Sequence, residues 1–123
     1  MKITNTIEAK IFLGLREGYT SNYKNMSDVY SFLSEYCTQN KLTVSVTPTK
    51  YIYVNGEEDG VIIGLINYPR FPSTKEEIKK IALDLGQKLL ELFYQYRVTI
   101  IINSLNESDS STIMLENNYM KDV

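Results

Sequence analysis

The chain has 123 residues, of which 43% are apolar and 23% charged, and its formal net charge is -2. We expect one domain over residues 1–123, because this length allows a single sizeable core. The composition excludes disordered and collagen-like classes, and the slight acidity argues against a partner that is a DNA or RNA polymer.

The chain contains no histidine, and Cys37 is its only cysteine. Histidine is the commonest general base and metal ligand near neutral pH, so hydrolases built on Ser-His-Asp or Cys-His groups are excluded. A lone cysteine excludes an intrachain disulfide and a cysteine-based zinc site. We therefore expect no catalytic residues of these classes, no metal and no cofactor.

No apolar run approaches the ~20 residues of a membrane-spanning helix. The first residues, MKITNTIEAK, lack the apolar core of a signal peptide. We therefore expect a cytoplasmic protein without a membrane partner.

The first elements are a strand over residues 6–15, a polar loop with the sequence LREGYTSNY, and a helix over residues 27–39. The helix is indicated by apolar residues that recur at positions 29, 32, 33, 36 and 37, which form one helical face. Ser27 is the expected N-cap.

A hairpin follows the helix. Residues 42–47 alternate as in a half-buried strand, Pro48 ends or bends it, and residues 51–54 resume the extended pattern. A turn at Asn55-Gly56 then leads to residues 61–66, which are apolar on both faces. That arm lies either inside a covered sheet or against another subunit. The acidic run Glu57-Glu58-Asp59 is expected in a solvated turn at the hairpin tip.

Helical spacing of apolar residues then extends over residues 73–96, with a capping box at Ser73 and Glu76. Leu83 and Leu90 form a second apolar stripe, for which self-association is the simplest cover.

A short β-branched strand over residues 97–103 precedes a polar loop over residues 104–112 and a weak last strand with a frayed tail. We treat residues 104–123 as a loop and a weakly structured segment. The element order is β-α-β-β-α-β, which predicts an α+β fold with two helices on one face of an antiparallel sheet.

The stretch INYPRFPSTKEE joins the hairpin to the long helix. Free amides at a helix N-terminus bind phosphate, Arg70 can add a guanidinium fork, and Phe71 can stack on a base. Alternatively, Phe71 packs near Ile78 and Ser73 occupies the amides itself. The residues alone leave both interpretations open.

Two other stretches could carry binding groups. Arg16 and Tyr19 in the loop LREGYTSNY offer a cation and a stacking face, or are exposed only for solubility. Thr49 offers a hydroxyl near a strand end, although β-branched residues are common in strands. Arg97 and Asn103, at the two ends of the strand RVTIIIN, either close a pocket or mark the edges of the strand.

The segments IFLGLREGY and VTPTKYIYVNGEEDGVIIGLINYPRFP, with the long helix after them, resemble the first described family of phage anti-Thoeris proteins. These are sponges that sequester glyco-cyclic ADP-ribose, a signal made by bacterial TIR enzymes. The similarity covers most of residues 5–103.

The resemblance implies a non-enzymatic phage protein that blocks Thoeris defence in the host cytoplasm. It implies a homo-oligomer, either dimer or hexamer, and some members of the family also bind cyclic oligonucleotides. In that family's pattern Phe71 stacks on the base, Arg70 and Arg16 contact phosphate, and Tyr19 is a second aromatic wall. The remaining implied ligand contacts are Asn67, Thr49, Arg97 and Asn103.

Two alternatives from other classes stay open. One is a metal-dependent enzyme that cleaves a cyclic nucleotide signal with Glu57, Glu58 or Asp59. The other is an inhibitor that binds a host defence protein through the aromatic loops.

Overall fold

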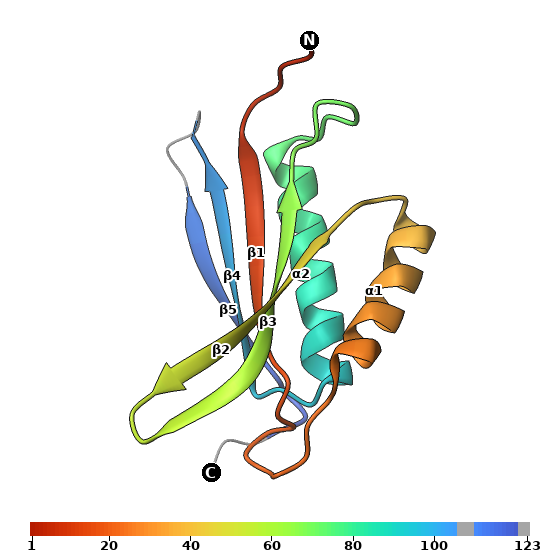
Figure 1. The fold of residues 1–123 in the computed structure, drawn as a ribbon. Helices are drawn as coiled ribbons and strands as arrows, with labels where there is room; N and C mark the ends of the chain where they lie inside the picture. Colours follow the sequence, from red (N-terminus) through yellow and green to blue (C-terminus); the bar gives the residue numbers. More distant parts are fainter. Residues whose placement is uncertain (106–109, 121–123) are drawn as a thin grey trace.

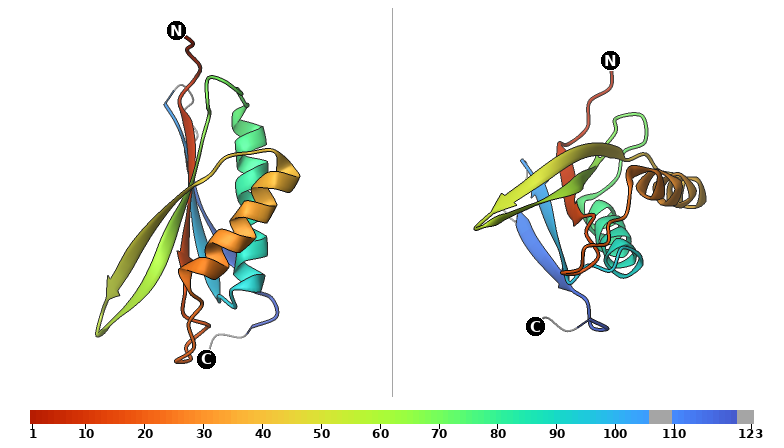
Figure 2. Two further views of the ribbon diagram at one scale, coloured as in Figure 1. Left: turned by 45° about the vertical axis from the view of Figure 1, so that its right-hand side comes forward. Right: turned by 60° about the horizontal axis from the view of Figure 1, so that its bottom comes forward.

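The computed structural model describes residues 1–105 and 110–120. The elements are β1 (Ile7–Gly14), α1 (Met26–Asn40), β2 (Ser45–Tyr53), β3 (Gly56–Ile66), α2 (Lys75–Leu92), β4 (Arg97–Ser104) and β5 (Ser111–Glu116) (Figure 1). They form an antiparallel five-stranded sheet in the order β2-β3-β1-β4-β5. Both helices lie on one face of this sheet (Figure 2), which confirms the predicted α+β architecture.

The core lies between the sheet and α2, with α1 alongside. Strand β1 is central and alternates strictly, so Ile11 and Leu13 are fully buried while Glu8 and Lys10 belong to the opposite face. Strands β3 and β4 contribute matching rows, and α2 presents Leu85. The apolar rows of the three strands are buried against α2, and this burial fixes how the strands are paired. A slip of one residue in the pairing would turn an apolar row toward solvent.

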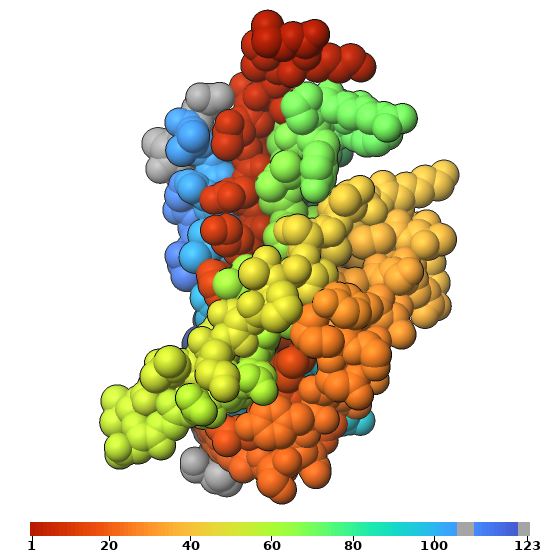
Figure 3. Space-filling model, viewed as in Figure 1, coloured from red at the N-terminus to blue at the C-terminus, as the bar shows by residue number. Residues whose placement is uncertain are grey.

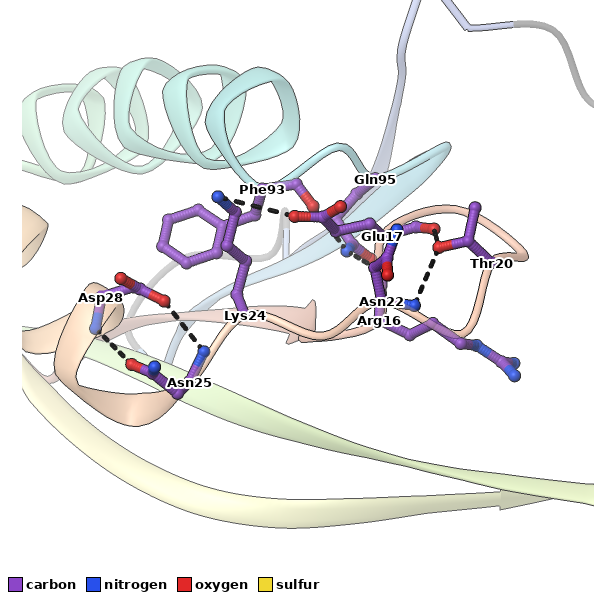
Figure 4. A network of polar contacts seen from close by, with 9 residues as sticks. All are labelled: Arg16, Glu17, Thr20, Asn22, Lys24, Asn25, Asp28, Phe93 and Gln95. Atoms are coloured by element: carbon purple, nitrogen blue, oxygen red, sulfur yellow. Dashed lines mark hydrogen bonds and ion pairs between the residues drawn. The ribbon is translucent and has the colours of Figure 1, made fainter.

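Helix α1 begins one residue before the expected N-cap, so the assignment of that cap to Ser27 was wrong. Asn25 is the N-cap: its side-chain oxygen accepts a hydrogen bond from the Asp28 amide at 3.0 Å. The Asp28 carboxylate accepts one from the Asn25 amide at 3.0 Å (Figure 4). This reciprocal pair satisfies two amides, and Ser27 donates its hydroxyl to Asn25 at 2.6 Å.

Helix α2 has its capping box one residue later than predicted. Thr74 and Glu77 exchange side chain to backbone hydrogen bonds of 3.1 and 3.2 Å. The Ser73 amide instead donates to Asn67 at 2.7 Å, so the predicted cap at Ser73 was wrong. The helix ends at Leu92, four residues before the predicted end, and Tyr94 follows with a φ of 52°.

The hairpin of β2 and β3 differs from prediction in two ways. Strand β2 is continuous through Pro48, which is tolerated because β2 is an edge strand. The turn consists of Val54 and Asn55, the latter with a φ of 60°, so the acidic run lies within β3 and outside the turn. The end of the hairpin projects beyond the rest of the sheet (Figures 1 and 3).

The second stripe of the long helix is covered within the chain. Leu90 is fully buried in the core, and Leu83 packs against it. The stripe therefore does not require a second subunit. Among the described residues, no helix is long and apolar enough to cross a membrane.

The last strand that the sequence left open is β5, which pairs with β4 from Arg97 to Ile102. Asn117, directly after β5, is buried and donates its side-chain amide to the backbone oxygens of Leu90 and Gln95. Residues 106–109 of the predicted polar loop and residues 121–123 of the predicted tail lie outside the described residues.

Candidate functional site

A cleft of about 350 Å³ opens where β1 ends and β4 begins. Its volume is within the range of small-molecule sites. Three segments far apart in sequence meet there: the loop after β1, the β2–β3 hairpin, and the connection from α2 to β4. Together they contribute Arg16, Gly18, Tyr19, Tyr53, Glu58, Gln95, Tyr96 and Arg97.

The loop after β1 is held in one shape by its own hydrogen bonds (Figure 4). The Glu17 amide donates to Asn22 at 2.8 Å, and the Thr20 hydroxyl donates to the Glu17 carbonyl at 2.6 Å. Gly18 has a φ of +57° and donates its amide to the Tyr94 carbonyl at 2.8 Å. Glycine suits this left-handed position, and the contact with Tyr94 fixes the loop against the end of α2.

Arg16 reaches across the cleft to the hairpin. Its Nη2 donates to the Tyr53 hydroxyl at 2.6 Å, and its Nε lies 3.9 Å from Glu58 Oε2. Among the described residues, nothing accepts a hydrogen bond from this buried Nε. A buried donor without an acceptor is unfavourable, so the site is suited to a ligand that carries an acceptor such as a carboxylate.

Glu58 is the acid of the cleft. Alternation along β3 places Glu57 and Asp59 on the opposite face, where both are ion-paired with Lys50 at 3.8 and 3.6 Å. Burial raises the pKa of the Glu58 carboxyl, and the Arg16 guanidinium opposes part of that rise. Glu58 thus combines partial burial with an anionic charge, a combination common at functional sites.

Tyr51, opposite Glu58 in the hairpin ladder, supports this arrangement. Its hydroxyl donates to the Val61 carbonyl at 3.0 Å. Burial raises its pKa to about 12, and the nearby Glu58 charge adds to the rise. The phenol therefore stays neutral at physiological pH.

An aromatic pair forms another wall. The ring centroids of Tyr19 and Tyr96 are 4.7 Å apart, at an interplanar angle of 33°. Tyr19 remains 57% exposed, so part of its ring is free to contact a ligand. Such a wall can stack on a flat heterocycle.

Of the predicted site residues, Arg16, Tyr19 and Arg97 line this cleft together. Thr49 lines a separate cleft of about 330 Å³ beside Asn25 and Pro48. Asn103 accepts a hydrogen bond from Ser110 at 2.8 Å, near the other end of β4. The predicted site residues thus lie in different parts of the structure. Ligand contacts by these residues stay predictions.

The residues predicted from INYPRFPSTKEE also lie away from the cleft. Arg70 is 5.1 Å from the ring centroid of its neighbour Phe71, which is 69% exposed. Asn67 is buried and donates to Thr4 and to the Asn5 carbonyl, which ties the chain before β1 to the entry of α2. The capping contacts of α2 occupy amides that a phosphate would need. Ligand binding by Asn67, Arg70 and Phe71 stays a prediction.

A larger cleft of about 760 Å³ lies between the C-terminal end of α1 and the N-terminal end of α2. Phe71, Tyr68, Cys37 and Ile78 are among its mostly apolar lining. Burial raises the pKa of the Cys37 thiol, which favours the unreactive form. We place the site in the cleft of about 350 Å³, because the buried Arg16 Nε, the partly buried Glu58 carboxylate and the Tyr19–Tyr96 pair meet there.

Sequence reasoning gave Glu58 a role only in the alternative of a metal-dependent enzyme, and it missed Gln95 and Tyr53 altogether. The acidic run was assigned to a turn, where all three carboxylates would be solvated. If the strand had been extended through the acidic run, its alternation would have placed Glu58 on one face of the sheet and Glu57 and Asp59 on the other. Among the described residues, no group of three or more acidic or cysteine side chains could hold a metal ion.

Two solved structures share this fold. A phage SAM lyase in its apo state matches with a TM-score of 0.77 and 19% identity, over 94% of this chain and 92% of that one. A phage SAM lyase in complex with S-methyl-5'-thioadenosine matches with a TM-score of 0.75 and 17% identity, over 98% and 97% of the two chains. No protein-family model matches the chain, and a search of curated proteins finds no match.

These matches correct the functional expectation from sequence. Resemblance to the anti-Thoeris family implied a non-enzymatic sponge with glyco-cyclic ADP-ribose as its partner. That assignment was wrong, because the solved proteins that share the fold over nearly their whole length are lyases of a different small molecule. The resemblance rested on the order of the segments and on two loop motifs. Proteins with different functions can share both features.

Proposed function

We propose that this chain is a lyase that acts on S-adenosylmethionine (SAM) and releases S-methyl-5'-thioadenosine. The observation that carries this proposal is the likeness to two phage SAM lyases over more than nine tenths of each chain, with TM-scores of 0.77 and 0.75. S-methyl-5'-thioadenosine is what remains of SAM when the bond between the sulfonium sulfur and Cγ of the amino-acid arm breaks.

The bond cleavage needs no oxidant, reductant or cofactor. The electron pair of the sulfur–Cγ bond passes to sulfur, which leaves as a neutral thioether. The substrate's own carboxylate can attack Cγ and close a five-membered lactone, so that one carbon–oxygen bond forms as the carbon–sulfur bond breaks. This route requires no general base, which is compatible with a chain without histidine.

The described cleft offers a partner for each part of SAM. The Tyr19–Tyr96 wall suits the adenine ring. Arg16, whose buried Nε has no acceptor among the described residues, suits the carboxylate, and Arg97 also lines the cleft. Glu58 suits the cationic part of the substrate. In this proposal the protein contributes positioning and electrostatics, while the reacting groups belong to SAM.

We place the activity in the cytoplasm of a host cell. SAM is a cytoplasmic metabolite, and the proteins that share the fold are phage lyases. Expression of the chain in bacteria should therefore lower the cellular concentration of SAM and raise that of S-methyl-5'-thioadenosine.

The direct test is incubation of the purified chain with SAM, followed by chromatography and mass spectrometry. We expect S-methyl-5'-thioadenosine and a four-carbon lactone in equal amounts. SAM bound but recovered intact would overturn the lyase assignment. SAM deuterated at Cβ distinguishes the chemistry: lactone formation keeps both deuterons, whereas elimination by a protein base loses one.

A further inference from the structure

We propose that Gln95 Oε1 and Glu58 Oε2 form, over Gly14, a subsite that recognises a sulfonium cation and discriminates against a neutral thioether. The inference rests on the proposed function, and it deepens it by naming how substrate is told from product. It is carried by three observations: the fixed orientation of the Gln95 amide, the missing side chain at position 14, and the chemistry of the converging atoms.

The orientation of the Gln95 side chain is fixed by two backbone carbonyls. Its Nε2 donates to the Arg16 carbonyl at 2.6 Å and to the Phe93 carbonyl at 3.0 Å (Figure 4). Both amide hydrogens are thereby used, so a flipped amide would set an oxygen against two carbonyl oxygens. The residue is only 7% exposed, and its backbone oxygen accepts a hydrogen bond from Asn117 at 3.1 Å. Oε1 is therefore held in one place.

That place is above Gly14, the last residue of β1. A Cβ atom at this position would lie 2.8 Å from Gln95 Oε1 and 3.2 Å from Glu58 Oε2. The two oxygens thus approach one point from different elements, the α2–β4 connection and β3. Any residue other than glycine would have to displace at least one of them, because 2.8 Å is shorter than real contacts of a Cβ.

The chemistry of these atoms suits a cation. An amide oxygen and an ionised carboxylate accept hydrogen bonds and cannot donate them. The sulfonium of SAM has no N–H, but its methyl and methylene hydrogens are polarised by the positive charge and are attracted to oxygen. Arg16, 3.9 Å from Glu58 Oε2, partly neutralises the carboxylate. The partial negative charge of the Gln95 amide oxygen is not offset by Arg16 in this way, so this oxygen still attracts the cation.

The subsite favours binding of the substrate over retention of the product. Before cleavage the sulfur is positively charged and is held by both oxygens. After cleavage the sulfur is neutral, and this attraction is lost. Methylthioadenosine would then be retained chiefly by its adenine ring, so that the product leaves more readily than the substrate.

The test compares two unreactive ligands by isothermal titration. Sinefungin has a protonated amine where SAM has its sulfonium, and S-adenosylhomocysteine has a neutral sulfur there. Both ligands keep the amino-acid ammonium, so their affinity ratio reports the difference at the sulfur position, where sinefungin has a positive charge with N–H donors and S-adenosylhomocysteine has a neutral sulfur. We expect the wild-type protein to bind sinefungin at least about tenfold more tightly.

The variants Gly14→Ala and Gln95→Met should bring this ratio close to one and leave the affinity for methylthioadenosine within about twofold. Gly64→Ala is the matched control, because its Cβ meets only the rotatable Ser45 side chain on the same sheet and outside the cleft. Two independent variants guard against misfolding, which thermal denaturation would reveal.

An unchanged ratio in both folded variants would overturn the inference, and so would a wild-type ratio near one, even if SAM is cleaved. Conversely, a wild-type ratio above ten that collapses in the variants would support the subsite even if no methylthioadenosine is released from SAM. In that case the lyase assignment alone would fail.

Discussion

Glu58 has an environment that its neighbours in sequence do not share. It lies between Glu57 and Asp59, which pair with Lys50 on the opposite face of β3. Alternation of the strand sends only Glu58 into the cleft, where burial raises the pKa of its carboxyl. Three adjacent acids therefore have two different environments, and the difference is testable by matched substitutions.

Replacement Glu58→Gln should lower the rate of methylthioadenosine release at SAM concentrations below KM by about 100-fold or more, because binding of the cationic substrate loses the anion that faces it. Glu57→Gln is the matched control and should change the rate by less than about twofold, since its carboxylate faces Lys50. The measurement is the initial rate of product formation by chromatography. Equal losses in both variants would contradict the assignment.

The raised pKa of Glu58 predicts opposite pH effects on binding and stability. Binding of a cationic ligand needs the ionised carboxylate, so affinity should fall as pH decreases through a midpoint above the ordinary value of 4.5. Folding favours the protonated carboxyl, so the stability that Glu58 contributes is present at low pH and is lost as pH rises through that midpoint.

Titration of sinefungin binding and thermal denaturation between pH 4 and pH 8 measure both effects. In Glu58→Gln the binding profile should flatten, and the melting temperature at neutral pH should equal or exceed that of the wild type. A wild-type profile that keeps its shape in the variant would show that another group titrates.

At the scale of elements, the sequence signals located both helices but not their first residues. Ser73-x-x-Glu76 and Thr74-x-x-Glu77 are overlapping capping boxes, and local sequence cannot choose between them. Asn67 makes the choice, because its side chain already accepts the Ser73 amide hydrogen bond and holds that residue outside the helix. A contact from the preceding connection thus decides where α2 begins.

The two candidate caps can be told apart by substitution. Thr74→Ala should lower the free energy of unfolding by about 1 kcal/mol, because the Glu77 amide loses its acceptor. Ser73→Ala should cost less than about 0.5 kcal/mol, because the Asn67 contact uses the backbone amide, which remains. Urea denaturation measures both values. A larger loss at position 73 would restore the cap expected from sequence.

At the scale of the whole molecule, the cleft depends on hydrogen bonds between segments that are distant in sequence. Asn117, directly after β5, binds the carbonyls of Leu90 and Gln95, and its backbone amide donates to Tyr96 at 2.9 Å. The connection that carries Gln95 and Tyr96 is therefore fixed by the residue after β5, at the end of the β4–β5 pair where Arg97 pairs with Glu116. Stability and site geometry are coupled through this one side chain.

Replacement Asn117→Ala should destabilise the fold by about 1–3 kcal/mol, because the Gln95 carbonyl loses this donor and the Leu90 carbonyl keeps only the Gln95 backbone amide among its described donors. It should also weaken binding of sinefungin, since the connection that carries Gln95 loses the contact between Asn117 and the Gln95 carbonyl. The exposed neighbour in Asn118→Ala is the control and should leave both quantities nearly unchanged. Denaturation and titration on the same samples make the comparison. Loss of stability with unchanged affinity would contradict the coupling.

The sequence by itself determined the fold class, because alternation in the strands and the 3.6-residue repeat in the helices are local properties of the chain. It also placed Arg16, Tyr19 and Arg97 among the candidates, since exposed arginine and tyrosine beside strand ends stand out by residue type. It misplaced the acidic run, because the turn at Val54 and Asn55 and the strand that follows are selected by pairing with β2.

Only the tertiary structure decided where the candidate site lies. Residues 16–19, 53–58 and 95–97 meet because the sheet order sets β1 between β3 and β4, and no local pattern encodes that neighbourhood. Gln95 and Gly14 became candidates only because the Gln95 side-chain oxygen lies close to Gly14 in the folded chain. The physical reason is that periodicity reports which face a residue occupies, whereas a binding site depends on which faces come together.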